Sequence, residues 1–432
     1  MQKFFLFLII AAICLCASNF GYSQNDGFLH KNGRILFPIG CYENPKDVEQ
    51  LKLMAESGIN IVHCHSREDL DRAASAGMLG VVPLSLQSGA ADDLKNYVKS
   101  LMDHPALAVW EGPDEIVWNF TAASMLYRQQ KVHKEPGEWW RQTDNAVVYS
   151  RQQAAQIIPK MREAAQMIRE MDSGKHPIWI NEAARSDLAY VRQYLDFVDI
   201  TGCDFYPVRK EERLIYRLGL VTDHWMQVGE GKPVWMVLQG FAWSELGEYY
   251  GVKETAYPTF DESRFMAYDV IAHGAKGVLY WGTSYLKSEL FRQSLYALTS
   301  ELAALQPFLT SPEKMDVKIN IFDFVMDNNP IARGVKSFFR RYDGDSLLVL
   351  INEDNRFQME VEAAGLEILE GQTLELLYGN DQAVIKHGAL LTRMKPYEVK
   401  VFASSRKWET ANRTGRDFFG IDVIRATIKS IQ

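Results

Sequence analysis

The chain has 432 residues, of which 47% are hydrophobic and 24% charged, so it has enough apolar material for two or three folded domains and too much for a disordered protein. Aromatic residues make up 12% of the chain, and surplus Trp and Tyr often line binding surfaces. The formal net charge of −8, without any block of Lys or Arg, argues against nucleic acid or an anionic membrane surface as a partner and favours neutral or small polar ligands.

The N-terminus has the pattern of a secretory signal peptide. Lys3 precedes an apolar run that reaches about Cys16 and is too short for a membrane span. We therefore expect residues 1–24 to be removed and the chain to be exported to the periplasm or the extracellular space, with no membrane association after cleavage. A lipid anchor on Cys14 or Cys16 is the alternative, but both follow a bulky residue where lipidation signals carry a small one.

Three cysteines remain after this cleavage: Cys41, Cys64 and Cys203. All three lie in apolar, strand-like runs, and an odd number of cysteines cannot pair completely. We expect them to act as small buried hydrophobic residues.

From residue 27 onwards, short apolar runs alternate with longer amphipathic ones, which is typical of strand–helix units that build a parallel sheet. Eight such strands predict a closed (β/α)8 barrel over residues 25–312. An open, doubly wound sheet is the alternative, but no GxGxxG follows the first strand. Glycines at Gly58, Gly77 and Gly277 are expected to end helices. The candidate strands cover residues 37–42, 59–65, 79–86, 107–111, 177–181, 198–206, 234–241 and 278–282.

Two insertions interrupt this rhythm, over residues 116–150 and 242–262. Both fall in loops that follow strands, the side on which barrel enzymes build their sites. Their aromatic residues are expected either to line a binding site or to form satellite packing clusters. These residues are Trp118, Trp139 and Trp140 in the first insertion, and Trp243, Tyr249 and Tyr250 in the second.

After the barrel the pattern changes to short alternating runs separated by turn signals such as DNNP and DGDS. This pattern predicts a small antiparallel β-sandwich over residues 313–403. Residues 404–432 are expected to form a polar linker and a terminal segment, helix or strand, that packs back on the protein.

Polar residues at the carboxyl ends of barrel strands are the candidates for chemistry, because apolar layers fill the interior below them. Carboxyl groups dominate these ends, and neither a Gly-rich phosphate loop nor a GxSxG nucleophile motif is present. The candidates are Glu43 and Asn44 after the first strand, His63 and His65 at the second, Glu111, Asp114 and Glu115 after the fourth, Asn181 and Glu182 at the fifth, Asp204 and Tyr206 at the sixth, Gln239 at the seventh, and Trp281 at the eighth.

His63 and His65 share one face of a strand, as in the metal-binding HxH pattern of barrel amidohydrolases. A metal site would need further His and Asp ligands on later strands, but the fifth and eighth strands end in WIN and YWG. We therefore expect no metal and no other cofactor, and substrate hydrogen bonding or simple packing for the two histidines.

Carboxyl groups beside aromatic walls are the combination that cleaves glycosidic bonds. One carboxyl protonates the leaving oxygen, the other attacks or activates water, and Trp or Tyr stacks on the sugar. Residues 27–310 resemble the (β/α)8 glycoside hydrolases of the large retaining clan, which carry an acid/base Glu after strand four and a nucleophile Glu after strand seven. The resemblance is carried by the order of NGRILFPIGCY, AVWEGPDE, GCDFYP, PVWMVLQGF and AHGAKGVLYWG.

This resemblance implies that Glu115 is the acid/base residue and Trp281 the aromatic platform beneath the sugar. Two positions depart from the clan's pattern: Asp114 stands where Asn is usual, and Gln239 stands where the nucleophile Glu is expected. An amide carries no charge and is a poor nucleophile, so Gln239 is unable to take that role.

Four mechanisms remain open after this mismatch. Glu182 or Asp204 is the nucleophile; Asp204 is the base of an inverting pair with Glu115; Asp114 and Glu115 act as in barrel hexosaminidases, where the acetamido group of the substrate attacks; or the barrel binds a glycan without cutting it. A carboxyl separation of about 5–5.5 Å indicates a retaining pair, and about 6.5–9.5 Å an inverting one.

The sequence thus predicts an exported glycoside hydrolase that acts on a polysaccharide or oligosaccharide, with Glu115 as general acid. A non-catalytic glycan-binding barrel is the alternative. The expected catalytic residues are Glu115, Asp204, Glu182 and Asp114, although Glu115 can also be a solvent-facing loop acid and Asp204 a structural residue. The expected substrate-binding residues, each of which can instead satisfy local structure, are His63, His65, Glu111, Asn181, Tyr206, Gln239, Trp243 and Trp281.

Overall fold

The computed structural model describes residues 26–124, 132, 134–135, 137–247, 251–321 and 334–420. The expected signal peptide, Tyr249, Tyr250 and the part of the terminal segment after residue 420 lie outside the described residues. Among the described helices, none combines the length and apolar character that a membrane crossing requires.

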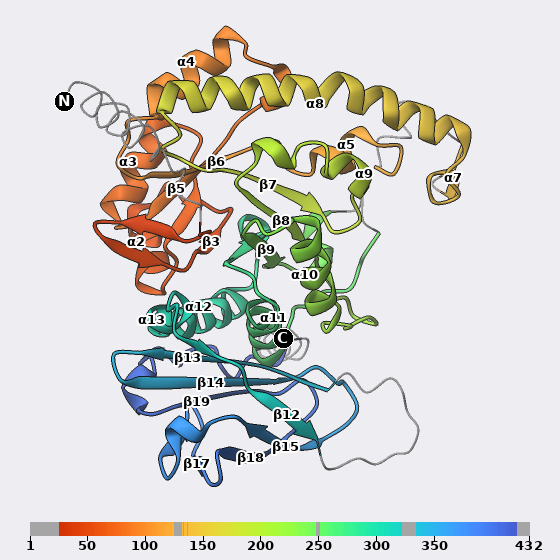
Figure 1. Ribbon diagram of the computed structural model, residues 1–432. Helices are drawn as coiled ribbons and strands as arrows, with labels where there is room; N and C mark the ends of the chain where they lie inside the picture. Colours follow the sequence, from red (N-terminus) through yellow and green to blue (C-terminus); the bar gives the residue numbers. More distant parts are fainter. Residues whose placement is uncertain are drawn as a thin grey trace, which may run out of the picture.

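Eight parallel strands form a closed barrel, which confirms the predicted fold class (Figure 1). Each strand pairs with its neighbours in chain order, and the last pairs with the first through Val278–Ile39 and Tyr280–Cys41. The barrel strands are β3 (Ile39–Cys41), β4 (Ile61–His63), β5 (Leu79–Pro83), β6 (Leu107–Glu111), β7 (Ile178–Ala183), β8 (Ile200–Asp204), β9 (Val234–Gln239) and β10 (Gly277–Trp281).

Helices connect the strands, and local capping groups set where several of them begin. The hydroxyl of Ser66 accepts a hydrogen bond from the backbone N–H of Asp69 at the start of α3, and Thr259 and Glu262 form a capping box at α11. The helices are α2 (Val48–Glu56), α3 (Arg67–Ser75), α4 (Asp92–Leu101), α5 (Ile116–Phe120), α7 (Gly137–Trp140), α8 (Asp144–Asp172), α9 (Leu188–Val191), α10 (Arg217–Val228), α11 (Phe260–Ala272), α12 (Glu289–Ala304) and α13 (Gln306–Leu309).

Two of the three predicted helix-ending glycines are in that role, and one prediction is wrong. Gly58 and Gly77 adopt positive φ just after α2 and α3. The glycine with positive φ after α11 is instead Gly274, with φ 103°, and Gly277 is the first residue of β10. Gly277 is required there for another reason, because a Cβ would lie 2.7 Å from the indole of Trp235 on the neighbouring strand.

The first insertion is more helical than its sequence suggested. It contains α5 and α7, and α8 begins within it and continues for 29 residues as the crossover between β6 and β7. In Figure 1, α8 runs along one side of the barrel and extends beyond it. A short hairpin precedes the barrel, β1 (Leu29–Lys31) and β2 (Arg34–Leu36), which turn through Asn32 and Gly33 at positive φ.

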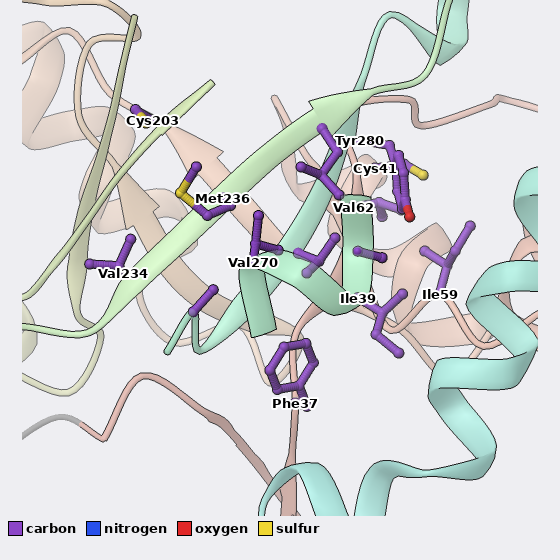
Figure 2. Close-up of a cluster of buried hydrophobic side chains, with 14 of the residues drawn as sticks. Phe37, Ile39, Cys41, Ile59, Val62, Cys203, Val234, Met236, Val270 and Tyr280 are labelled. Atoms are coloured by element: carbon purple, nitrogen blue, oxygen red, sulfur yellow. The ribbon is translucent and has the colours of Figure 1, made fainter. Parts of the chain in front are cut away.

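Alternation along the barrel strands divides the core into an outer and an inner layer. In β9, Val234, Met236 and Leu238 belong to the large cluster between strands and helices, whereas Trp235 and Val237 belong to a separate cluster inside the barrel. Figure 2 shows part of the outer cluster, including Cys41 and Cys203. The described cysteines, Cys41, Cys64 and Cys203, are buried and free, as predicted.

The C-terminal region is an antiparallel β-sandwich, as predicted. Its two sheets have the strand orders β11-β13-β14-β19-β16-β17 and β12-β15-β18, and apolar residues from both sheets form one core. The strands are β11 (Lys314–Met315), β12 (Lys318–Ile321), β13 (Val335–Tyr342), β14 (Asp345–Asn352), β15 (Met359–Ala364), β16 (Thr373–Leu376), β17 (Gln382–Val384), β18 (Ala389–Met394) and β19 (Val399–Ala403).

The segment after the sandwich returns to the barrel. Asn412 donates a hydrogen bond to Ser300 on α12 (3.0 Å), and the guanidinium of Arg416 lies 2.7 Å from the carboxylate of Glu301. The ring of Phe418 packs on Tyr257 and Phe291 of the barrel, with ring centroids 6.2 and 5.6 Å apart. Up to residue 420, this segment therefore joins the two regions by direct contact.

Candidate active site

The alternation of the strands decides which predicted residues face the barrel mouth. Residues two or four positions beyond an inner core residue share its face, because side chains on a strand alternate. Trp179, Ile200 and Val237 are inner core residues, so Asn181, Asp204 and Gln239 follow on the inner face. The same rule places Tyr42, His63, Glu111 and Trp281 on that face, and Glu182 on the outer one.

Three carboxyl groups meet at this mouth: Asp114, Glu115 and Asp204. The carboxyl groups of Glu115 and Asp204 lie within reach of each other, and each affects the pKa of the other. The Nδ2 of Asn181 donates to Oδ1 of Asp114 (2.9 Å) and to Oδ2 of Asp204 (3.3 Å). Because a carboxylate only accepts hydrogen bonds, a bond between two carboxyl groups requires one of them to carry a proton. A hydrogen bond between Glu115 and Asp204 therefore forms only when one of the two carries a proton.

The surroundings favour the protonated forms of these groups. Loss of contact with water raises the pKa of Asp204 well above its usual range, and the charges of Glu115 and Asp114 raise it further. Desolvation also raises the pKa of Glu115, against the lowering effect of its hydrogen bond with Asp204. The pKa of Asp114 rises for the same main reason, with Glu111 as the next cause. Asp114 keeps an exposed surface, but its carboxyl faces the crowded mouth.

The backbone at Glu115 is in a conformation that non-glycine residues seldom adopt. Its φ and ψ are 49° and 38°, in the left-handed region, directly between β6 and the first residue of α5. Such a conformation costs roughly 1 kcal/mol and persists only where neighbouring structure enforces it. Here the backbone N–H of Glu115 donates to the carbonyl oxygen of Asn181 (2.9 Å), which ties the acid to the strand that carries its neighbours.

A second cluster of polar side chains, Tyr42, His63 and Glu111, lies beside the carboxyl pair. The hydroxyl of Tyr42 donates to Oε1 of Glu111 (3.2 Å), and Nε2 of His63 lies 3.1 Å from Oε2 of Glu111, outside hydrogen-bond geometry. The rings of Tyr42 and His63 are 3.9 Å apart between centroids. Desolvation and then the charges of Glu111 and Asp114 raise the pKa of Tyr42. The hydroxyl therefore stays protonated and is able to donate a hydrogen bond.

Aromatic rings form a continuous wall on the other side of the mouth. Tyr206 stacks on Trp281 with centroids 5.5 Å apart and planes at 18°, and its hydroxyl hydrogen-bonds to Asp204. Phe241 lies edge-on to Trp281 (5.2 Å) and to Trp243 (5.3 Å). Stacked aromatic faces of this kind suit the apolar face of a sugar ring. The wall joins the carboxyl pair through the hydroxyl of Tyr206.

The structure does not bring Glu182 to the mouth. Its side chain is fully buried on the outer face of β7, where its carboxylate accepts hydrogen bonds from the N–H of Val117 (3.0 Å) and the hydroxyls of Ser186 (2.7 Å) and Tyr194 (3.0 Å). Burial raises the pKa of Glu182 to about 7 in spite of these donors. These contacts give Glu182 a structural task, holding α5 and the loop after β7 against the strand.

The carboxamide of Gln239 also hydrogen-bonds to backbone groups of the protein. Its Oε1 accepts from the N–H of Val208 (2.9 Å), and its Nε2 donates to the carbonyl oxygens of Val208 (2.9 Å) and Phe241 (3.1 Å). The residue is fully buried. At the position where the resembling clan carries its nucleophile, this chain therefore has an amide that fastens the loop after β8 to β9.

The remaining predicted residues are dispersed. His65 is exposed, with its ring 6.2 Å from that of His63. In the first insertion, Trp139 is buried in a satellite cluster with Ala122 and Ala146, and Trp140 is exposed. Within the described part of the chain, the single group of three possible metal ligands lies elsewhere and includes neither His63 nor His65.

Sequence reasoning missed two members of the site, Tyr42 and Phe241. Tyr42 was treated only as the end of a strand, although it stands one residue beyond Cys41 and so on the opposite, inner face. Phe241 was assigned to the end of the seventh strand, whereas β9 ends at Gln239 and Phe241 belongs to the loop. The alternation signal was present in the sequence for Tyr42, but nothing in it marked Phe241.

No protein-family model matches the chain, and no curated protein sequence matches it. Similar solved structures include a GH30 endoxylanase from Clostridium papyrosolvens C71, with 11% identity, 87% of this chain and 97% of that chain covered, and a TM-score of 0.46. A family 51 α-L-arabinofuranosidase from Bifidobacterium longum has 9% identity, coverage of 85% and 95%, and a TM-score of 0.48.

A third similar structure, a β-galactosidase from the psychrophilic Marinomonas ef1, has 14% identity and a TM-score of 0.43. The match covers 62% of this chain and 60% of the length of that β-galactosidase. At these identities and scores the likeness carries no argument about function. The functional assignment therefore rests on the geometry of the mouth.

Proposed function

We propose that the chain is an exported glycoside hydrolase that cleaves glycosidic bonds in a polysaccharide or oligosaccharide, with Glu115 as the general acid. The observation that carries this proposal is the desolvated, mutually interacting carboxyl pair of Glu115 and Asp204 beside the stacked rings of Tyr206 and Trp281. Carboxyl groups with raised pKa values next to an aromatic wall supply both a proton donor and a surface for a sugar ring. Export is supported by the apolar run after Lys3.

In this mechanism, the proton that the pair retains is held by Glu115 once the substrate lies between the two carboxyl groups, and Glu115 transfers it to the glycosidic oxygen as the bond to the anomeric carbon breaks. Asp204 remains as the carboxylate that faces the positive charge developing on the sugar, and Asn181 and Tyr206 hold it in place by hydrogen bonds. Water supplies the hydroxyl group of the new reducing end, and the proton that it releases returns to the carboxyl pair, which restores the starting state. The hydroxyl oxygen of Tyr42, whose proton is directed to Glu111, can accept a hydrogen bond from a sugar hydroxyl group.

The spacing of the pair adds one requirement. A hydrogen bond between carboxyl oxygens spans roughly 2.5–3.0 Å, which is shorter than the separations of about 5–5.5 Å or 6.5–9.5 Å found in working glycosidase pairs. Substrate binding must therefore part Glu115 and Asp204, with the glycosidic bond entering between them. The proton that the pair retains is then available to the leaving oxygen.

Release of reducing sugar from a panel of glycans tests the proposal. We expect Glu115→Gln to lower kcat/KM by roughly 10²–10⁴-fold on any glycan that the wild type cleaves, because the amide has no proton to donate at neutral pH. Glu68→Gln is the matched control, since Glu68 is largely exposed on α3, and it should leave activity unchanged. Equal activity in wild type and Glu115→Gln would remove Glu115 from the mechanism.

A second candidate, a barrel that binds glycans without cutting them, is favoured by one observation. The amide of Gln239 occupies the position of the clan's nucleophile, and its hydrogen bonds are all used within the protein. Calorimetric binding of a glycan that remains intact after long incubation would support this function. Turnover of the same glycan would exclude it.

A further inference from the structure

A cluster of ionisable side chains lies away from the mouth, where the barrel meets the sandwich. Asp269 is on α11, His273 caps the end of that helix, and Glu353 follows the last residue of β14. The Nε2 of His273 lies 2.9 Å from Oε1 of Glu353 and 3.6 Å from Oδ1 of Asp269. One donor atom from each of the three residues lies within 4.8 Å of the other two.

Asp269 is the unusual member of this cluster. Its side chain is fully buried, and apart from the backbone amide of Gly219, which lies close enough to lower its pKa, neither carboxylate oxygen has a hydrogen-bond partner among the described residues. A buried carboxylate without donors is costly, and such groups generally pair with a cation or coordinate a metal. The free oxygens point to a missing positive partner.

The absence of a side chain at Gly219 leaves space beside His273 and Asp269. A Cβ at residue 219, on the facing helix α10, would lie 2.5 Å from Nε2 of His273 and 2.8 Å from Oδ2 of Asp269. Any other residue would therefore press directly on both of these atoms. Glycine lets the two helices approach while leaving the nitrogen and the oxygens unobstructed.

A fourth carboxylate orients the histidine ring. Oδ1 of Asp223, also on α10, lies 2.8 Å from Nδ1 of His273, at ion-pair distance but outside hydrogen-bond geometry. A carboxylate at this distance favours a proton on Nδ1, which leaves the lone pair of Nε2 on the other side of the ring, toward Asp269 and Glu353. A carboxylate behind a histidine is the usual support for a metal-ligating imidazole.

We propose that Asp269, His273 and Glu353 form a binding site for a zinc-like divalent transition-metal ion, with Asp223 as the positioning residue. Two ligands about 2.1 Å from a tetrahedral ion lie about 3.4 Å apart, close to the 2.9 and 3.6 Å separations seen here. The imidazole nitrogen argues against Ca²⁺ and Mg²⁺, which take oxygen ligands. The two ligand carboxylates neutralise a dication.

This site goes beyond the proposed function, because it lies outside the mouth and joins two parts of the chain. Two ligands come from the barrel and one from the sandwich, so a bound ion would hold β14 against α11. The competing state is a protonated His273 that bridges Asp223 and Glu353 without a metal. Lys336 is the nearby cation that acts on Asp269, and the metal adds to its effect.

Zinc binding to the full-length protein tests the site. After treatment with EDTA and removal of the chelator, titration calorimetry with ZnCl₂ should show one tight equivalent, and the unfolding midpoint should rise by about 3 °C or more at a hundredfold excess over Kd. That equivalent should be lost in Asp269→Asn and His273→Gln. CaCl₂ at the same concentration should not compete.

Two further variants sharpen the test. Asp223→Asn keeps all three ligands and should weaken zinc binding about 10–100-fold; Asp223 is half-exposed, so this variant remains usable if the buried ones fail to fold. His176→Gln is the matched control, because buried His176 lies away from the cluster, against Asp172 (3.3 Å) and the ring of Trp110 (5.9 Å between centroids). It should leave zinc binding unchanged.

Absence of zinc binding in the wild type would overturn the proposal, as would undiminished binding in Asp269→Asn or wild-type affinity in Asp223→Asn. In each of these cases, a protonated His273 that bridges Asp223 and Glu353 would explain the cluster. Because the measurement is binding of zinc and not turnover of a glycan, its outcome is independent of the proposed hydrolase function.

Discussion

Buried carboxyl groups occur at the barrel mouth and at the contact between the barrel and the C-terminal segment, in opposite surroundings. At the contact, Glu301 is fully buried, yet it lies 2.8 Å from Nε of Arg264 and 2.7 Å from Arg416, and it accepts from the hydroxyl of Tyr268 (2.8 Å). The two guanidinium groups lower the pKa of Glu301 despite its burial.

At the mouth, the donors to Asp204 are neutral. Asn181 and Tyr206 supply an amide and a hydroxyl, and none of the largest influences on the pKa of Asp114, Glu115 or Asp204 is a cation. Their pKa values therefore rise. Glu301 is built to be ionised and to hold the chain together, whereas the mouth keeps a proton available at a cost in stability. This difference supports the proposal that the mouth is the functional region.

The largest effect should follow from Asp204→Asn. The amide can accept from Asn181 and Tyr206 and donate to Glu115, so the local fold should persist, but the carboxylate that faces the developing charge is lost. We expect kcat/KM to fall by roughly 10²–10⁴-fold, while the free energy of unfolding at pH 7 does not fall, because a desolvated acid has been removed. Reducing-sugar release and urea unfolding measure the two quantities.

The control for this variant is Asp103→Asn, at an exposed position between α4 and β6, which should change neither activity nor stability. A loss of stability as large as the loss of activity would show that Asp204 acts structurally. The contrast with Glu301 would then disappear.

Glu301→Gln should give the opposite result. Loss of the charge leaves Arg264 buried and unpaired, so we expect the free energy of unfolding to fall by about 3–5 kcal/mol, with kcat/KM of the folded protein unchanged. Urea unfolding and activity below the unfolding midpoint are the measurements. Glu289→Gln, on the same helix, removes an exposed carboxylate whose partner Arg292 keeps its pairing with Glu43, and it should change stability by less than about 1 kcal/mol. A large loss of activity in folded Glu301→Gln would contradict the division of roles.

The fold could be predicted from the sequence because the barrel depends on short-range patterns. Eight apolar runs at strand length, separated by amphipathic helices, specify the barrel, and the switch to alternating runs specifies the sandwich. Details that depend on packing were harder to read. The position of Gly277 after an apolar helix predicts a helix end, whereas its actual constraint is the indole of Trp235 on the neighbouring strand.

The site was only partly readable from the sequence. Strand ends identified Glu111, Glu115 and Asp204, and strict alternation would have added Tyr42 and set Glu182 on the outer face. The approach of Glu115 to Asp204 was not readable, because it depends on a left-handed backbone at Glu115. Likewise, no motif links Asp269 and His273 to Glu353, which is 80 residues further along the chain.

The surroundings of Glu182 are intermediate between those of Glu301 and those of the mouth. Its carboxylate accepts several hydrogen bonds, but no cation pairs with it among the described residues. Burial raises its pKa from 4.5 to about 7, so between these pH values the folded state keeps a proton that the unfolded state has lost. Stability should therefore fall as pH rises through this window, by at most about 3 kcal/mol. Subtracting the stability–pH curve of Glu182→Gln from that of the wild type isolates this contribution, since the hydroxyl of Ser186 can turn to accept from the new amide.

The same subtraction for Glu301→Gln should slope the other way, with stability lost as pH falls below the ordinary pKa of a glutamate. A flat difference curve for Glu182 would mean that hydrogen bonds alone offset its burial, and the raised pKa values at the mouth would then need a cause other than the lack of a cation.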